Sequence, residues 1–125
     1  MNDTKILVWL EPGDILHHSW GYDQTNCDFY EVVAVKGLMV DLRKISHHEV
    51  SGGGAAMSAM VMPDKGQYVD NSLNALNDGR VGPDEPIRKR VQAYLNGDKL
   101  EYYIRAKYGC CRLWDGNPCY ESWYA

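Results

Sequence analysis

The segment Ser19–Val33 constrains the fold more than any other part of this 125-residue chain. It combines an aromatic–glycine–aromatic turn at Trp20–Tyr22, a run of polar and thiol side chains from Asp23 to Asp28, and an apolar strand. Most connections between two strands take about two to five residues, so a loop this long and aromatic indicates a further role. Large aromatic rings dominate the energetics of binding interfaces. The segment therefore predicts either the corner of a small barrel or the recognition surface of a binding module.

The composition indicates a folded chain with many half-buried rings. Hydrophobic residues make up 45% of the sequence, which is enough for one domain with a core of its own. Tyrosine occurs 9 times against a single phenylalanine, and its ring suits positions with one apolar and one wet end. No apolar run reaches the roughly 20 residues that span a bilayer, so we expect no membrane partner. The first residues lack the features of a signal peptide, and we expect a cytoplasmic protein.

The four cysteines are expected to be free thiols. Cys110 and Cys111 are adjacent and point to opposite faces of a strand, so they are poor disulfide partners for each other. Cys119 follows closely and Cys27 lies far upstream, a spacing that matches no common zinc module. We therefore predict no metal site and no cofactor.

Alternating apolar residues predict a mainly antiparallel β protein. Ile15–Ser19, Asp28–Val35 and Leu38–Ile45 form the expected meander, with a tight turn at Lys36–Gly37. The following stretch is rich in glycine, proline, asparagine and aspartate, which predicts a long irregular excursion. The predicted fold class is a mainly β, small SH3-like barrel. The expected single domain, 1–125, divides into an N-terminal β-meander at 5–45, the irregular excursion at 46–86, and a C-terminal β-rich segment at 87–125.

The segment after Pro86 is compatible with two structures. Pro86 at a first helical position, with Ile87, Val91 and Tyr94 on one face, indicates a short helix. Alternating apolar residues on both sides of Asn96–Gly97 instead predict a β-hairpin, and we favour it because Asn-Gly is the stronger local signal. The aromatic C-terminal residues predict a docked final strand.

Several motifs resemble one family of small proteins encoded by phages, prophages and other mobile elements. They are Gly13–Ile15, Ser19–Asn26 with Asp28–Tyr30, Arg88–Val91, Leu113–Gly116 and the terminal Ser122–Ala125. The resemblance spans most of the chain and is weakest over residues 46–80. It implies an accessory gene of a mobile element, a class that includes inhibitors of host defence, and hence a location in the host cytoplasm. It carries no catalytic residue over to this chain.

Candidate catalytic and metal-binding groups are present, but their pattern favours structural roles. His17–His18 and His47–His48, with Glu49, supply metal-ligand types. Neighbouring residues on a strand face opposite sides, so only one histidine of each pair can join a cluster, and we expect exposed or strand-edge histidines. Acid–base catalysis by Asp23, Asn26, Asp28 and Glu31 would require convergence in a cleft; the alternative is Asx bonding within the turn. We predict no catalytic residue, and an uncharacterised enzyme is our third hypothesis.

The net charge of −4 is unevenly distributed. Residues 1–79 hold 5 basic and 11 acidic groups, whereas residues 80–125 hold 8 basic and 6 acidic groups. The acidic half argues against a general nucleic-acid binder, but the basic half contains tyrosines that can stack on unpaired bases. The same basic groups are also compatible with a solvated face that balances the acidic half.

Two binding hypotheses follow. The first is a non-enzymatic, anti-CRISPR-like protein that occludes a host protein, such as a nucleic-acid-binding defence effector, with the acidic half imitating nucleic acid. Its predicted contact residues are Trp20, Tyr22, Asp23, Asp28, Arg88 and Arg90. The second is an RNA- or single-strand-DNA-binding barrel, with predicted contacts at Arg88, Lys89, Arg90, Tyr102, Arg105 and Lys107. Truncating the aromatic pair Trp20 and Tyr22 is expected to weaken partner binding without unfolding the protein.

Overall fold

The computed structural model of the chain describes residues 10–21, 25–52, 58–72, 74–76, 81–107 and 109–122. These residues form nine strands and no helix, which confirms the predicted mainly β class. The strands are β1 (Ile15–Trp20), β2 (Asn26–Lys36), β3 (Met39–Gly52), β4 (Ser58–Tyr68), β5 (Ile87–Arg90), β6 (Gln92–Asn96), β7 (Lys99–Arg105), β8 (Cys110–Leu113) and β9 (Cys119–Ser122).

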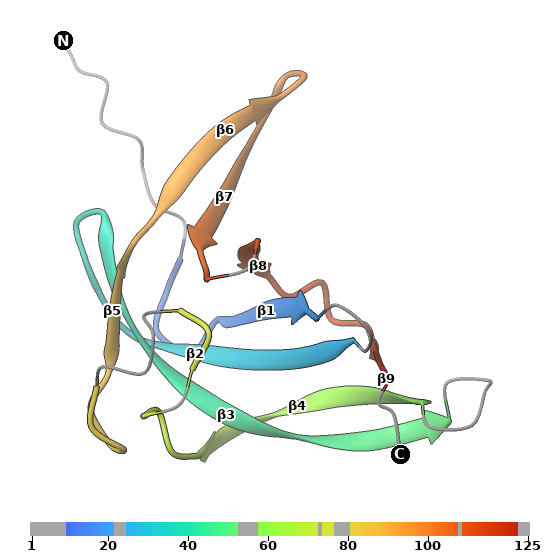
Figure 1. Ribbon diagram of the computed structural model, residues 1–125. Helices are drawn as coiled ribbons and strands as arrows, with labels where there is room; N and C mark the ends of the chain where they lie inside the picture. Colours follow the sequence, from blue (N-terminus) through green and yellow to red (C-terminus); the bar gives the residue numbers. More distant parts are fainter. Residues whose placement is uncertain are drawn as a thin grey trace, which may run out of the picture.

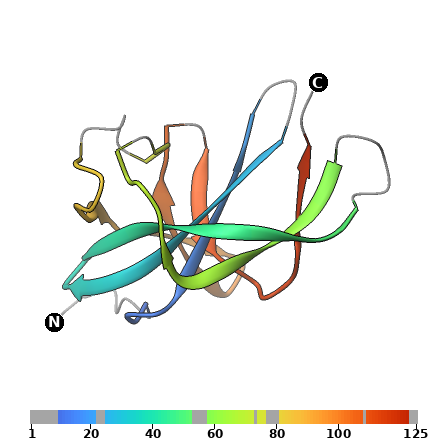
Figure 2. The same ribbon diagram turned by 90° about the horizontal axis from the view of Figure 1, so that it is seen from below.

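The strands form one antiparallel sheet in the order β6-β7-β8-β1-β2-β3-β4-β9, and β5 pairs with β3 beside this path. Figures 1 and 2 show the sheet curled into a half-barrel, with the β6–β7 hairpin at one end and β4 with β9 at the other. The predicted meander is confirmed as β1-β2-β3, in which Phe29 lies between His17 and Ile45. Gly37, with φ of 61°, makes the tight turn between β2 and β3.

The prediction of an irregular excursion over 46–86 is wrong for its first half. β3 continues to Gly52, and β4 occupies Ser58–Tyr68. The glycine-rich composition suggested a loop, but Ala59 and Val61 alternate into a buried cluster and β4 pairs on both sides, with β3 and β9. Cross-strand packing therefore overrode the local composition. Among the described residues of 46–86, irregular backbone follows after Tyr68, and residues 53–57 lie outside the described residues.

The C-terminal third adopts the predicted hairpin rather than the alternative helix. β6 and β7 pair across the Gly97 turn, with Leu95 opposite Leu100. Ile87 lies in β5, which extends the sheet beside β3 instead of beginning a helix. β9 pairs with β4, which confirms a docked strand near the end of the chain; residues 123–125 lie outside the described residues.

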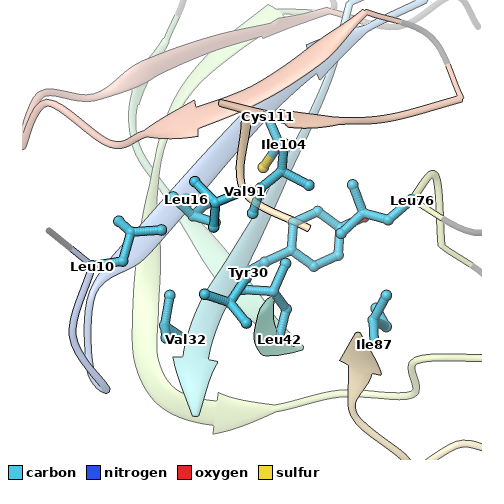
Figure 3. Close-up of a cluster of buried hydrophobic side chains, with 11 residues drawn as sticks. Leu10, Leu16, Tyr30, Val32, Leu42, Leu76, Ile87, Val91, Ile104 and Cys111 are labelled. Carbon is cyan, nitrogen blue, oxygen red and sulfur yellow. The ribbon is translucent and has the colours of Figure 1, made fainter. Parts of the chain in front are cut away.

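Buried side chains lie on both faces of the central strands. On one face, a large cluster surrounds Tyr30, Leu42 and Ile104 (Figure 3). On the opposite face, Phe29 and Ile45 pack with Cys27 in a smaller cluster. Because side chains alternate along a strand, the run Cys27–Val32 supplies both clusters, which explains its nearly continuous burial.

Burial in the smaller cluster predicts a pH-dependent stability. Cys27 is 1% exposed, its Sγ donates to the carbonyl oxygen of Tyr120 at 2.8 Å, and burial raises the pKa of its thiol from 9.0 to about 11. The folded state holds this proton more tightly than the unfolded state. The resulting stabilisation is complete below the unfolded pKa and is lost as the pH rises towards 11.

We therefore expect urea unfolding between about pH 8.5 and 11 to show a falling free energy of unfolding, with on the order of 2 kcal/mol from Cys27. Cys27→Ala should flatten part of this slope, although it lowers stability at every pH. Cys110→Ala, at a partly exposed position, is the matched control and should keep the slope. An unchanged slope in Cys27→Ala would contradict the prediction.

Candidate binding pocket beside the β6–β7 hairpin

The structure brings together Trp20 and Asp28, two of the predicted partner-binding residues. The indole Nε1 of Trp20 donates to Asp28 Oδ2 at 2.7 Å, and Lys44 Nζ lies 3.5 Å from Asp28 Oδ1. The His18 ring, fully buried, stacks on the indole at 6.4 Å between centroids. Only 13% of the Asp28 side chain is exposed, so its carboxylate stabilises the end of the β1–β2 hairpin. Tyr22 and Asp23 lie outside the described residues.

Arg88 and Arg90 lie far from this pair. Both belong to β5, where Arg90 pairs with Met39 near the β2–β3 turn. Asp28 lies near the opposite end of β2. At about 3.3 Å per residue, the length of β2 between Asp28 and the β2–β3 turn is roughly 25 Å. The six predicted partner contacts therefore do not form one surface. Arg88 is also engaged internally, because its Nε donates to Asp41 Oδ1 at 2.9 Å and this hydrogen bond lowers the pKa of Asp41.

The predicted nucleic-acid contacts lie on β5, on β7 and on the turn that follows β7. Lys89 Nζ donates to the carbonyl oxygen of Leu76 at 3.0 Å, so its charge is turned towards the protein. Tyr102 packs against the large cluster, whereas Arg105 is exposed three residues further along β7, where alternation directs it to the opposite face. Lys107 is exposed on the following turn, where its backbone N–H donates to Ala75. Lys89 and Lys107 thus both lie beside the Ala75–Leu76 segment, whereas Arg88 is paired with Asp41.

The histidines are divided between the two faces, as their adjacency predicts, and His48 is exposed as expected, but His18 is more buried than expected. His17 and His47 both contact the Phe29 ring, at 5.3 and 5.7 Å between centroids. His18 is fully buried on the other face, so the prediction of exposed or edge histidines is wrong for this residue. His48 Nδ1 contacts Asp64 Oδ1 at 2.6 Å. Among the described residues, no group of three or more metal-ligating side chains converges.

Several acidic side chains of the first half are engaged within the protein. Glu31 is only 7% exposed and accepts hydrogen bonds from the Gly66 backbone N–H and the Tyr68 hydroxyl. Asp64 accepts a hydrogen bond from Ser46, which is the main cause of its lowered pKa. Together with Asp28 and Asp41, these carboxylates stabilise the fold, so these four are not free to imitate nucleic acid.

A pocket opens on the large-cluster side of the sheet, beside the β6–β7 hairpin. Its volume is about 330 Å³, near the lower end of the range for ligand pockets. We call it the leucine pocket; its apolar lining includes Leu10, Leu16, Leu100, Tyr102, Ile104 and Leu113, and Lys99, Glu101 and Arg112 also contribute atoms to the lining. Figure 3 shows Leu10, Leu16, Ile104 and Cys111 as neighbours in the core cluster that forms its floor. The pocket is therefore an open extension of the core.

Exposed leucines surround this pocket. Leu113 is 56% exposed and Leu100 is 39% exposed, and both line it. Leu95, opposite Leu100 on the same face of the hairpin, is 72% exposed and extends the apolar surface to the hairpin tip. A single exposed leucine is ordinary on a protein surface, whereas contiguous exposed apolar side chains are typical of interaction sites.

The other face of the same hairpin is polar and internally bonded. Glu101 accepts hydrogen bonds from Asn96 Nδ2 and the Tyr94 hydroxyl. Both bonds lower the pKa of Glu101, and the bond from Asn96 has the larger effect. Arg112 Nη1 donates to the Tyr94 oxygen at 3.0 Å, and its guanidinium lies 5.9 Å from the Tyr103 ring centre. The hairpin is thus amphipathic, with a satisfied polar face and an apolar face open to solvent.

Local sequence patterns do not predict the leucine pocket. The available signal was Leu95 and Leu100 on both sides of the Asn96–Gly97 turn, because hairpin tips are normally polar. Leu10, Leu16 and Leu113 come together only when β8 pairs with β1, a long-range contact that no local pattern indicates.

Comparison of the chain with protein-family models, curated proteins and solved structures finds no match. Within the described ranges, no helix has the length and apolar character required to cross a membrane.

Proposed function

We propose that this chain is a non-enzymatic binding protein that recognises a partner protein through the leucine pocket. One observation carries the proposal: Leu95, Leu100 and Leu113 are exposed around an apolar pocket that continues the core. Burying such side chains against a partner contributes about 25 cal/mol per Å² of apolar area removed from water. An apolar pocket with exposed leucines at its edge suits a protein partner better than a phosphate backbone.

The state of the buried thiols supports a binding role over a nucleophilic one. The raised pKa of Cys27 keeps it as a thiol near neutral pH, and burial also raises the pKa of Cys111. A catalytic cysteine instead needs an accessible thiolate with a lowered pKa. Tyr30 is likewise protonated, because burial raises its pKa.

The resemblance to mobile-element accessory proteins suggests the kind of partner. We propose a host defence protein, such as a component of a CRISPR–Cas system, which the chain occludes by binding. The contact surface in this proposal is the leucine pocket, whereas Trp20 and Asp28 hold the β1–β2 hairpin in shape.

The test is affinity capture of the tagged protein from bacterial lysate, with and without nuclease, followed by mass spectrometry. Leu95→Asp and Leu113→Asp place a charge on the proposed surface and should reduce recovery of the partner by about tenfold or more. Val50→Asp is the matched control, since Val50 is 43% exposed on β3, and it should bind like the unmodified protein. Equal recovery by all variants would contradict the proposal.

A single-strand nucleic-acid-binding barrel is the second candidate function. On the polar face of the hairpin, Tyr94 and Tyr103 lie 5.6 Å apart between ring centres, beside the guanidinium of Arg112. Rings next to an arginine can stack on unpaired bases. This alternative predicts that the protein retards single-stranded nucleic acid in electrophoresis, and that the retardation weakens steeply with added salt and in Arg112→Ala. It also predicts that the partners captured from lysate are lost after nuclease treatment.

A further inference from the structure

We propose that the partner contributes an extended segment, apolar at alternate positions and flanked by acidic residues, which adds as a strand to the outer edge of β6. This inference rests on the proposed function and specifies how the leucine pocket is occupied. Strand addition obtains affinity from backbone hydrogen bonds and specificity from pockets for alternate side chains.

β6 is the end strand of the sheet. In the part of the chain that the structure describes, β6 pairs on one side only, with β7. Figure 1 shows β6 and β7 extending from the half-barrel at this end of the molecule. An exposed edge presents unpaired N–H and C=O groups, and proteins usually protect such edges with charges or proline. β6, with the sequence QAYLN, carries neither.

The hairpin register identifies the backbone groups at this edge. Asn96 and Lys99 flank the two-residue turn, so they form a pair that exchanges backbone hydrogen bonds. Such pairs alternate with non-bonded pairs along an antiparallel ladder. Counting from the turn, Leu95–Leu100 and Ala93–Tyr102 are non-bonded pairs. The backbone N–H and C=O groups of Leu95 and Ala93 therefore point away from β7.

The side chains at these two positions face the leucine pocket. Leu95 and Ala93 pair with Leu100 and Tyr102, both of which line it. Residues directly opposite each other on neighbouring strands share a face, so every second side chain of an added strand would lie on the apolar side. These side chains would cover exposed Leu95 and pass over the small Ala93 towards the pocket.

The charge of this region favours an acidic partner segment. Residues 92–113 contain four basic side chains and two acidic ones, a balance of +2, and two of the basic residues, Lys99 and Arg112, contribute to the lining of the leucine pocket. Glu101, one of the two acidic residues, already accepts two hydrogen bonds within the hairpin. Complementary charge accelerates encounter and fixes the register of docking.

The test is selection of peptides from a phage-displayed library of random twelve-residue peptides, using four forms of the protein. The unmodified protein should enrich peptides with apolar residues at alternate positions and flanking acidic residues. Ala93→Pro removes an outward N–H without removing a β6–β7 bond, and should weaken binding of these peptides by about tenfold or more. Ala93→Val keeps the N–H and should bind them normally. Leu95→Asp tests the pocket itself.

Hydrogen exchange supplies a readout that does not depend on the proline variant folding. Addition of an enriched peptide should slow exchange at the Ala93 and Leu95 amides by about tenfold, while the Tyr94 amide, already bonded to β7, changes little. Enriched peptides with helical spacing, or unchanged affinity in folded Ala93→Pro, would overturn strand addition while leaving the pocket proposal intact. Failure to enrich any peptide, or peptides that bind Leu95→Asp equally well, would overturn both.

Discussion

Phe29→Ala is expected to lower the free energy of unfolding by about 4 kcal/mol, the largest effect predicted for this chain. Phe29 is completely buried at the centre of β2. Its ring lies 5.3 Å from His17, 5.7 Å from His47 and 6.3 Å from Trp114 between centroids, so it joins β1, β2 and β3 to the segment that follows β8. Alanine would leave a cavity that these larger rings cannot fill without moving the strands that carry them.

Urea denaturation followed by circular dichroism measures this effect. Phe29→Leu retains most of the volume and should cost about 1.5 kcal/mol or less, which separates cavity formation from loss of the ring contacts. Leu95→Ala, at a position 72% exposed, is the control and should change stability by less than about 0.5 kcal/mol. A loss of stability in Phe29→Ala no greater than in Leu95→Ala would show that the smaller cluster does not hold the sheet together.

Asn71→Ala is expected to lower the free energy of unfolding by about 3 kcal/mol, although it removes only one polar side chain. Asn71 is fully buried. Its Oδ1 accepts the Lys44 backbone N–H at 2.7 Å, and its Nδ2 donates to the Glu85 carbonyl at 2.9 Å. The side chain thus ties the irregular segment after β4 to β3. Alanine would leave both backbone groups without this partner in a partly buried environment, at a cost of about 1–3 kcal/mol each.

The same denaturation experiment tests this prediction, with Asn96→Ala as the matched control. Asn96 donates a single hydrogen bond to Glu101 at the exposed hairpin, so its loss should cost about 0.5 kcal/mol. Hydrogen exchange provides a second measurement, because the Lys44 amide should lose protection selectively in Asn71→Ala. A variant as stable as Asn96→Ala would show that water replaces both bonds and that Asn71 does not hold this segment.

Local sequence patterns predicted the elements whose side chains alternate clearly. The β1-β2-β3 meander followed from β-branched and aromatic runs, and the β6–β7 hairpin followed from Asn96–Gly97 between two alternating segments. β4 was missed because its pattern is weak: small residues and methionines surround Ala59 and Val61. Its strand conformation depends on pairing with β3 and β9, which are contacts that composition does not encode.

The candidate site shows the same division between local and long-range information. Trp20 and Asp28 were identified as important, but their roles could not be assigned, because an aromatic–acid pair in a loop fits both recognition and structure. Their mutual hydrogen bond shows that both residues have a structural role. The leucine pocket requires β8 to pair with β1 and the β6–β7 hairpin to curl over the core, so no single segment of the sequence contains it.

By itself, the sequence determined the β character of the chain, its central meander, its C-terminal hairpin and the division of adjacent histidines between two faces. Each of these properties depends on residues close together in the chain, where backbone preference and side-chain alternation act directly. The tertiary structure alone decided which charges are neutralised inside the fold, which polar groups Asn71 satisfies, and where apolar surface stays open. Those outcomes depend on partners distant in sequence, whose proximity arises only when the sheet closes into its curled form.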